Sequence, residues 1–372
     1  MSTAAAHSQL FAPIKVGRME LKHRLAMAPL TRFRADENHV HHEIAQTYYG
    51  QRACEPGTLI ITEATFIDPL AGGYPHVPGC STPEQVAGWK KIVDEVHARG
   101  SKIYLQAWSL GRVASAEQLE KESNSWVVGA SDIPSEGGAK PRPMTKEQIQ
   151  DYVNYYARCA KLFVEEAGGD GIEIHNANGY LLDQFLQSVS NNRTDEYGGS
   201  IENRARFPLE VAKAVCDAIG ADRVGIRLSP YSSFQDMKMK SIEEIKETFS
   251  YFVKELRDRH PEMAYIHCVE SRIAGNTTVD ADQAETLDFL HDIWAPRPFL
   301  IAGGFDAESA PKAADKYENT VVVVGRYFIS NPDLVRRVRE GIPLAPYNRD
   351  TFYLYGPDKT EGYTDYDFAP KN

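Results

Sequence analysis

The stretch "STPEQVAGWKKIVDEVHARGSKIYLQAW", residues 81–108, joins one helix pattern to one strand pattern. Thr82 stands at the position of a helix N-cap, and Gln85, three residues later, completes a capping box. Pro83 occupies the first helical position and Gly100 ends the helical pattern. The final run, "KIYLQAW", is rich in residues that favour strands. A helix joined directly to an apolar strand is the repeating unit of α/β folds.

The same alternation of strand and helix recurs along the chain. With 102–108, eight strand-like runs are found: "RLAMAPL" (24–30), "TLIITEAT" (58–65), "GIEIHN" (171–176), "RVGIRLS" (223–229), "AYIHCVE" (264–270), "PFLIAGG" (298–304) and "TVVVVGR" (320–326). Helical patterns lie between them, near 43–53, 82–100, 144–168, 200–219, 241–256, 280–293, 306–316 and 327–340. The pattern near 144–168 opens with a second capping box, formed by Thr145 and Gln148. This order predicts a single (β/α)8 TIM barrel, with a doubly wound open sheet as the alternative.

One connection is much longer than the others. Residues 109–143 contain "SEGGAKPRP" and show no helical period, so we expect a lid-like insertion after the third strand. The barrel itself is expected to span 8–360, with 361–372 as a C-terminal tail.

The composition excludes several classes of protein. The formal net charge is −11 and no block of Lys and Arg occurs, so a nucleic-acid or anionic-membrane partner is not expected. The five cysteines form no CxxC pair, which argues against a disulfide framework or a thiolate metal site. No signal peptide pattern and no run of about 18 apolar residues is present. We expect a cytoplasmic protein that holds no metal.

Glycines follow the last two predicted strands, in "AGGF" (302–305) and "VGRYF" (324–328). Gly303, Gly304 and Gly325 would let backbone N–H groups approach a phosphate, and Arg326 would add charge. The alternative is a pair of tight turns beside a surface arginine. Neither GxGxxG nor GxxxxGK[ST] occurs, so a mononucleotide is the expected ligand rather than a Rossmann-bound dinucleotide.

Other strand ends carry polar side chains. Arg227 would place a cation in the barrel mouth, where either an anionic or electron-rich ligand or an ion pair with Glu63 or Glu270 must meet it. Gln106 and Thr31 suit the edge of a heteroaromatic ring, although each alone is more often structural.

The fourth strand is followed by "HNANGY", which contains His175, Asn178 and Tyr180. His175 and Asn178 are close enough along a turn to converge on one acceptor, although local backbone capping is the simpler interpretation. Their position at a barrel strand end makes a site about equally plausible. Trp108, two residues beyond Gln106, is interpreted as barrel packing or a pocket wall.

Two other patterns contain residues that metal sites and glycosidases use. "HVHH" (39–42) lacks a second separated pair of ligands and is expected to be an exposed loop. Glycoside hydrolysis needs two carboxylates, which could come from Glu63, Glu173 and Glu270, but their spacing in the sequence does not define a pair.

Together, the motifs resemble those of the Old Yellow Enzyme family of flavin-dependent ene-reductases, especially its yeast, plant and fungal branch. The matching stretches are "APLTR" (28–32), "PGTLIITEATF" (56–66), "AGGYPHVPG" (71–79), "LQAW" (105–108), "DGIEIHNANGYLLDQFL" (170–186), "NNRTDEYGGSIENRARF" (191–207), "VGIRLSP" (224–230), "AGGF" (302–305), "VGRYFISNPDL" (324–334) and "RDTFY" (349–353). The match runs in order over about residues 8 to 356.

The resemblance implies that the barrel holds FMN non-covalently at its C-terminal mouth. By matched position, the cofactor would contact Pro29, Thr31, Ala64, Gln106, His175 and Arg227 through its ring, and Gly303, Gly304, Gly325 and Arg326 through its phosphate. Arg227 would lie at the N1/O2 side, where negative charge collects on reduction. The phosphate set agrees with the prediction made above from the glycines alone.

The resemblance further implies a reaction with NADPH as the reductant. The reduced flavin passes hydride from N5 to the β-carbon of an enone or enal. His175 and Asn178 would stabilise the charge that develops on the carbonyl oxygen, and Tyr180 would protonate the α-carbon. The substrate would lie among Tyr74, Trp108, His175, Asn178, Tyr180, Phe234 and Tyr353.

Some features of the expected enzyme stay open. Family members that isomerise tend to lack the tyrosine at this place, so Tyr180 favours net reduction. Thr277 falls near a position where the family often carries a bulky aromatic residue, which leaves substrate size undefined. The expected partners are small enones and enals, and the expected assembly is a monomer or homodimer. A flavin-binding protein without catalytic activity is the alternative.

Overall fold

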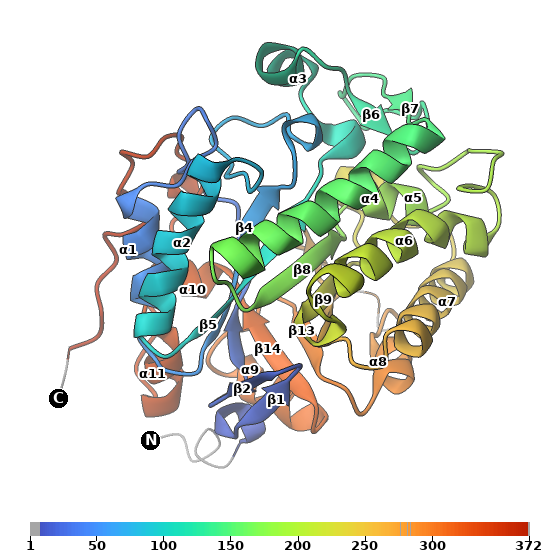
Figure 1. The fold of residues 1–372 in the computed structure, drawn as a ribbon. Helices are drawn as coiled ribbons and strands as arrows, with labels where there is room; N and C mark the ends of the chain where they lie inside the picture. The colour runs from blue at the N-terminus through green and yellow to red at the C-terminus, as the bar shows by residue number, and fades with distance from the viewer. Residues whose placement is uncertain (1–7, 276, 281, 283, 371–372) are drawn as a thin grey trace.

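Eight parallel strands form one closed barrel in the computed structural model, which describes residues 8–275, 277–280, 282 and 284–370 (Figure 1). The barrel strands are β3 (Leu25–Met27), β4 (Leu59–Phe66), β5 (Lys102–Trp108), β8 (Gly171–Asn176), β9 (Val224–Leu228), β10 (Tyr265–Val269), β13 (Phe299–Ala302) and β14 (Thr320–Val324). Each pairs in parallel with both neighbours, and β14 closes the circle on β3. The predicted (β/α)8 barrel is therefore confirmed over an open sheet.

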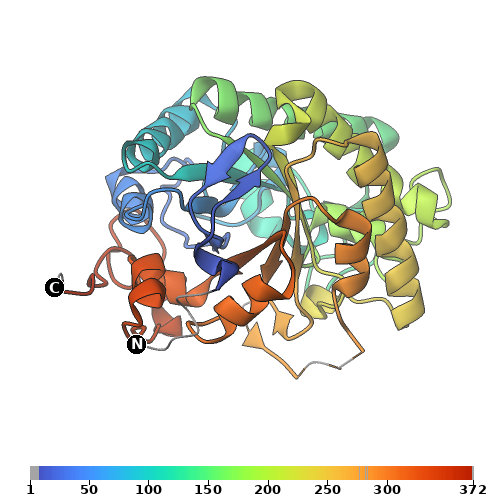
Figure 2. The ribbon, with the colours of Figure 1, turned by 90° about the horizontal axis from the view of Figure 1, so that it is seen from below.

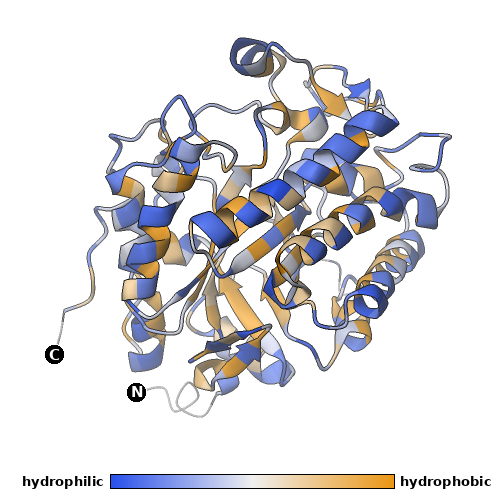
Figure 3. Ribbon diagram, viewed as in Figure 1, coloured by the Kyte–Doolittle hydropathy of each residue, from blue (hydrophilic) through white to orange (hydrophobic). Residues whose placement is uncertain are grey.

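Helices surround the barrel and turn their polar faces outward (Figures 2 and 3). They are α1 (Glu43–Arg52), α2 (Pro83–Ala98), α3 (Ala116–Ser123), α4 (Lys146–Lys161), α5 (Leu181–Leu186), α6 (Ile201–Ile219), α7 (Ile242–Arg259), α8 (Asp288–Trp294), α9 (Ser309–Lys316), α10 (Arg326–Ser330) and α11 (Leu334–Glu340). Short 3-10 turns are η2 (Gln9–Phe11), η3 (Pro69–Ala71), η4 (Gly111–Val113), η6 (Ala221–Arg223), η7 (Phe234–Asp236) and η8 (Arg349–Thr351), and a π turn, η5 (Leu162–Glu166), extends α4. Reciprocal capping boxes start α2 and α4, as predicted from Thr82 and Thr145.

Three helical predictions need correction. In the pattern near 280–293, of which residues 281 and 283 lie outside the described residues, the described part is helical only in α8, and the pattern near 327–340 is divided between α10 and α11. Residues 109–143 do contain a helix, α3, capped by the Ser115 side chain, which accepts a hydrogen bond from the N–H of Gln118. Leu119 is its one buried residue, so the helix leaves almost no apolar periodicity in the sequence. The same segment contributes the short pair β6 (Val128–Gly129) and β7 (Arg142–Pro143).

The N-terminal end of the barrel is closed. The hairpin of β1 (Ile14–Val16) and β2 (Met19–Leu21) lies across this end in the view from below (Figure 2). Its buried side chains Val16, Met19 and Leu21 join the apolar cluster of the barrel interior. Within the described part of the chain, the cavity opens at the opposite, C-terminal mouth.

The residues predicted as a C-terminal tail pack against the barrel over the described part, to 370. Tyr363 is fully buried and its ring stacks on Tyr48 with centroids 4.0 Å apart. Arg32 Nη2 donates to the carbonyl oxygen of Gly362 at 2.6 Å, and Arg52 Nη2 donates to that of Tyr363 at 3.1 Å. Residues 371–372 lie outside the described residues. No helix among the described residues has the length and apolar character needed to cross a membrane.

Two tyrosines fill the lower barrel because neighbouring strands carry glycine at facing positions. A Cβ atom at Gly225 would lie 2.2 Å from the Tyr265 ring, and one at Gly171 would lie 2.4 Å from the Tyr104 ring. Both rings are fully buried and their centroids are 5.7 Å apart. The two glycines are thus required by packing.

We expect Gly225→Ala to lower the free energy of unfolding by about 1–3 kcal/mol, because the added methyl group overpacks the barrel interior. The measurement is a thermal melt of the apoprotein followed by circular dichroism. Gly129→Ala is the matched control, since a Cβ atom there meets nothing closer than 3.4 Å. Equal melting temperatures for the two variants would contradict the packing requirement.

Candidate active site

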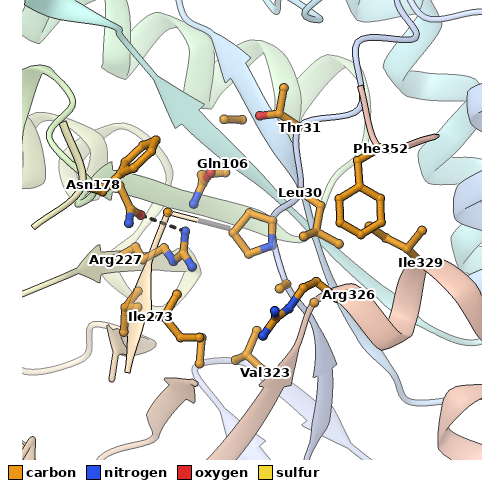
Figure 4. A pocket seen from close by; sticks show the side chains of 18 of the residues that line it. Leu30, Thr31, Gln106, Asn178, Arg227, Ile273, Val323, Arg326, Ile329 and Phe352 are labelled. Atoms are coloured by element: carbon orange, nitrogen blue, oxygen red, sulfur yellow. Dashed lines mark hydrogen bonds between the residues drawn. The ribbon is translucent and has the colours of Figure 1, made fainter. Parts of the chain in front are cut away.

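A cavity of about 670 Å³ opens at the carboxyl ends of the barrel strands (Figure 4). Every residue predicted for the site lines it: Pro29, Thr31, Ala64, Tyr74, Gln106, Trp108, His175, Asn178, Tyr180, Arg227, Phe234, Gly303, Gly304, Gly325, Arg326 and Tyr353. The structure thus gathers residues from both ends of the chain, because strand ends of a parallel barrel meet at one mouth. The volume is within the range of small-ligand sites.

The predicted phosphate residues line the cavity directly after two neighbouring strands, β13 and β14. Gly304 has a φ of +67°, and a Cβ atom there would lie 2.8 Å from Arg326 Nη2. Arg326 Nη2 donates to the Thr278 hydroxyl at 3.0 Å, and its guanidinium carbon lies 5.4 Å from the centre of the Tyr347 ring. Among the described residues lining the cavity, Asp306 is the one acid, against the cations Arg227 and Arg326. This balance favours an anionic ligand.

The turn after β8 is held in an unusual backbone conformation. Asn178 has a φ of +57°, and its N–H donates to the Ser229 hydroxyl at 2.7 Å. The N–H of Gly179 donates to Asp183 Oδ2 at 2.9 Å. Burial raises the pKa of Asp183 to about 7. These bonds fix the direction in which the side chains of Asn178 and Tyr180 point.

Arg227 determines the orientation of the Asn178 amide. Its Nη1 donates to Asn178 Oδ1 at 3.2 Å (Figure 4), which leaves the Asn178 amino group for another acceptor. The expected alternative, an ion pair of Arg227 with Glu63 or Glu270, is wrong. Glu63 accepts from the Tyr49 hydroxyl at 3.2 Å, and Glu270 pairs with Arg272.

His175, which pairs in register with Arg227, and Tyr180 contribute adjacent aromatic rings to the cavity wall. Their rings meet edge to face with centroids 4.8 Å apart, and the Trp108 ring stacks beside His175 at 6.2 Å. Burial, assisted by the charge of Arg227, holds the pKa of His175 well below its ordinary value, so the imidazole is neutral. Burial raises the pKa of Tyr180, so its hydroxyl stays protonated. His175 Nδ1 has no hydrogen-bond partner within the described part of the chain.

Several cavity residues were not predicted. Phe33 has a φ of +58°, and its ring lies 4.9 Å from Tyr355 and 5.6 Å from Tyr353. Gln235 follows Phe234 at the rim and also has a positive φ. Phe33 follows the motif "APLTR", and Tyr355 lies two residues beyond Tyr353. Their positions next to motif residues are therefore the signal that could have identified them.

The structure supports neither a metal site at "HVHH" (39–42) nor a glycosidase pair among Glu63, Glu173 and Glu270. His41 in "HVHH" is only 5% exposed and packs edge to face on Trp89, so the prediction of an exposed loop is wrong there. Among the described residues, no group of three or more His, Cys, Asp or Glu side chains could hold a metal. None of Glu63, Glu173 and Glu270 lines the cavity, which removes the carboxylate pair needed for glycoside hydrolysis.

Comparison with known proteins gives a consistent result. The model of the NADH:flavin oxidoreductase / NADH oxidase family matches residues 9–345. Chanoclavine-I aldehyde reductase fgaOx3 of Penicillium roqueforti is 49% identical, covering 97% of each chain. The probable inactive dehydrogenase easA of Claviceps fusiformis is 46% identical, covering 97% of this chain and 95% of its own.

A solved structure extends the similarity to the fold. Old Yellow Enzyme from Pichia sp. AKU4542 superposes with a TM-score of 0.89 at 40% identity, covering 99% of this chain and 95% of that one. Sequence, barrel topology and the length of the match therefore agree. The chain belongs to the NADH:flavin oxidoreductase / NADH oxidase family, here called the Old Yellow Enzyme family.

Proposed function

We propose that this oxidoreductase binds FMN in the cavity and uses NADPH to reduce the C=C bond of α,β-unsaturated carbonyl compounds. The observation that carries the proposal is that all the site residues implied by the family resemblance line one cavity. The residues fit an FMN molecule: the glycines and Arg326 that follow β13 and β14 suit a phosphate, and Gln106, Thr31 and Arg227 suit the polar edge of a flavin. When bound, FMN supplies hydride transfer from NADPH to the substrate β-carbon.

His175 and Asn178 are suited to hold the substrate's carbonyl oxygen. Both lie on the cavity wall, and Asn178 has its amino group free because its oxygen is bonded to Arg227. Neutral His175 can donate from one ring nitrogen. Two fixed N–H donors at a low-dielectric site would stabilise the negative charge that develops on this oxygen during reduction.

Tyr180 is the proposed proton donor to the α-carbon. Its ring meets that of His175 edge to face on the cavity wall, and its raised pKa keeps the hydroxyl proton in place across the neutral pH range. Tyr74, Trp108, Phe234 and Tyr353 are proposed to enclose the substrate. Since one relative is named an aldehyde reductase and another a probable inactive dehydrogenase, activity itself is the first property to measure.

The purified protein is expected to be yellow and to oxidise NADPH only when an enone, an enal or a maleimide is added. The measurement is absorbance of the flavin and of NADPH, with NADH as the comparison reductant. A colourless protein that takes up no FMN would contradict the proposal. A yellow protein without substrate-dependent NADPH oxidation would instead indicate a non-catalytic flavin protein.

Tyr180→Phe is expected to slow oxidation of the reduced enzyme by an enone by about 10²–10⁴-fold, because the general acid is lost. Reduction of the enzyme by NADPH should keep its rate. Stopped-flow absorbance separates the two half-reactions, and Tyr251→Phe on α7 applies the same change away from the cavity. Equal losses in both half-reactions would exclude the proton-donor role.

Arg326→Ala is expected to weaken FMN binding by about 10- to 100-fold, because a charge-assisted contact to the phosphate is lost. Riboflavin lacks the phosphate, so its affinity should not change. Fluorescence titration of the apoprotein with each flavin measures both constants. The phosphate assignment fails if riboflavin and FMN lose affinity equally.

A further inference from the structure

Glu173 is a fully buried carboxylate inside the barrel, below the cavity floor. Its Oε1 accepts a hydrogen bond from Gln106 Nε2 at 2.8 Å. Its Oε2 accepts from the Tyr265 hydroxyl at 3.0 Å and bonds His267 Nδ1 at 2.9 Å. Of these four side chains only Gln106 lines the cavity. The network therefore lies beneath the proposed flavin site and reaches it through one amide.

The network leaves Gln106 a single orientation. A carboxylate only accepts hydrogen bonds, so the atom of Gln106 that faces Glu173 must be the amino group. The amide oxygen is then available to the cavity, where it can accept from an N–H group. For the same reason His267 carries its proton on Nδ1, and burial lowers the pKa of its imidazole, so it is neutral.

Glu173 also places a negative charge close to Arg227. In the strand register, Glu173 lies opposite Gly225 and His175 lies opposite Arg227, so the carboxylate is one layer below the guanidinium. Glu173 is fully buried and Arg227 is half-buried, and the neighbouring His267 together with the charge of Arg227 holds the pKa of Glu173 below its ordinary value. A buried cation without a nearby anion would be costly. Glu173 is thus the acid that balances Arg227.

We propose that Glu173 is a positioning residue for the flavin: it fixes Gln106 with its oxygen toward the cavity and offsets the charge of Arg227. This inference rests on the proposed FMN site. It assigns to Glu173 control of two quantities, the affinity for oxidised FMN and the reduction potential. Charge near a flavin ring changes its electronic properties, so both quantities respond to a buried carboxylate.

Glu173→Gln tests the inference because it keeps the size of the side chain and removes the charge. The carboxylate accepts from three donors, Gln106, Tyr265 and His267. The new glutamine amide has one oxygen and one amino group, so its amino group must face one of these donors, and Gln106 no longer has a single preferred orientation. We expect the dissociation constant for FMN to rise at least about tenfold. With Arg227 no longer balanced, the reduced, more negative flavin should be favoured. A tenfold shift in the ratio of the two affinities raises the two-electron potential by about 30 mV.

A double-mutant cycle with Gln106→Ala separates positioning from general stability. If Glu173 acts through Gln106, its effect on FMN affinity should largely disappear in the Gln106→Ala background. Additive losses, or a Glu173→Gln variant with unchanged affinity and potential, would overturn the inference. Wild-type protein that binds no FMN would instead overturn the proposed function.

Tyr265→Phe provides a second test should the charge substitution prevent folding. It removes one donor to Glu173 and leaves the carboxylate in place. Tyr104→Phe is the control, since the Tyr104 ring is a buried neighbour 5.7 Å away whose hydroxyl faces the backbone oxygen of Asp222. We expect the FMN potential to shift for Tyr265→Phe only. Identical potentials for the two variants would overturn the role of the network.

Discussion

Closure of the parallel barrel is the constraint on which the cavity depends. The pairing of β14 with β3 joins the last barrel strand to the first, and it brings Arg326 to the same mouth as Pro29. Because all eight strands are parallel, the polar side chains at their carboxyl ends gather at this mouth, while apolar side chains of the β1–β2 hairpin pack at the opposite end. As a consequence, the cavity has two cations at separate positions, Arg227 and Arg326, and this arrangement suits an elongated, anionic ligand.

Inside this mouth, charged groups set the orientation of two neutral amides. Arg227 donates to the oxygen of Asn178, so Asn178 presents an amino group. Glu173 accepts from the amino group of Gln106, so Gln106 presents an oxygen. Opposite orientations of two similar side chains follow from the signs of their charged partners. The cavity therefore distinguishes a ligand's acceptor from its donor before any ligand binds.

Regular features were predictable from the sequence because they depend on local patterns. Near-continuous apolar runs identified the eight strands, and the boxes at Thr82 and Thr145 identified two helix starts. Helix α3 was missed because only Leu119 on it is buried. A place on the cavity wall was predictable for residues that end a strand. Phe33 and Gln235 reach the cavity from loops where they adopt a positive φ, and because neither is a glycine, the sequence does not mark these turns.

The sequence could not show which acidic side chain lies close to Arg227. The sequence offered two acidic candidates for Arg227, Glu63 and Glu270, yet both are bonded elsewhere. The buried carboxylate one layer below Arg227, on the neighbouring strand, is Glu173. Glu173 had been considered only as a possible catalytic carboxylate. Which of several glutamates meets an arginine depends on strand register and on glycines such as Gly225, and these are properties of the closed barrel.

The buried charges are better explained by ligand binding than by stability. A buried ion pair contributes little net stability, since desolvation of both groups offsets their attraction, and apolar residues of similar volume often do as well or better. Tyr104 and Tyr265 show that this barrel already accommodates large, mostly apolar side chains. The two charged side chains have a role in ligand binding instead, because the Arg227 guanidinium faces the cavity and the Glu173 carboxylate holds the Gln106 amide. The interior of the barrel is thus organised around the charge of what binds above it.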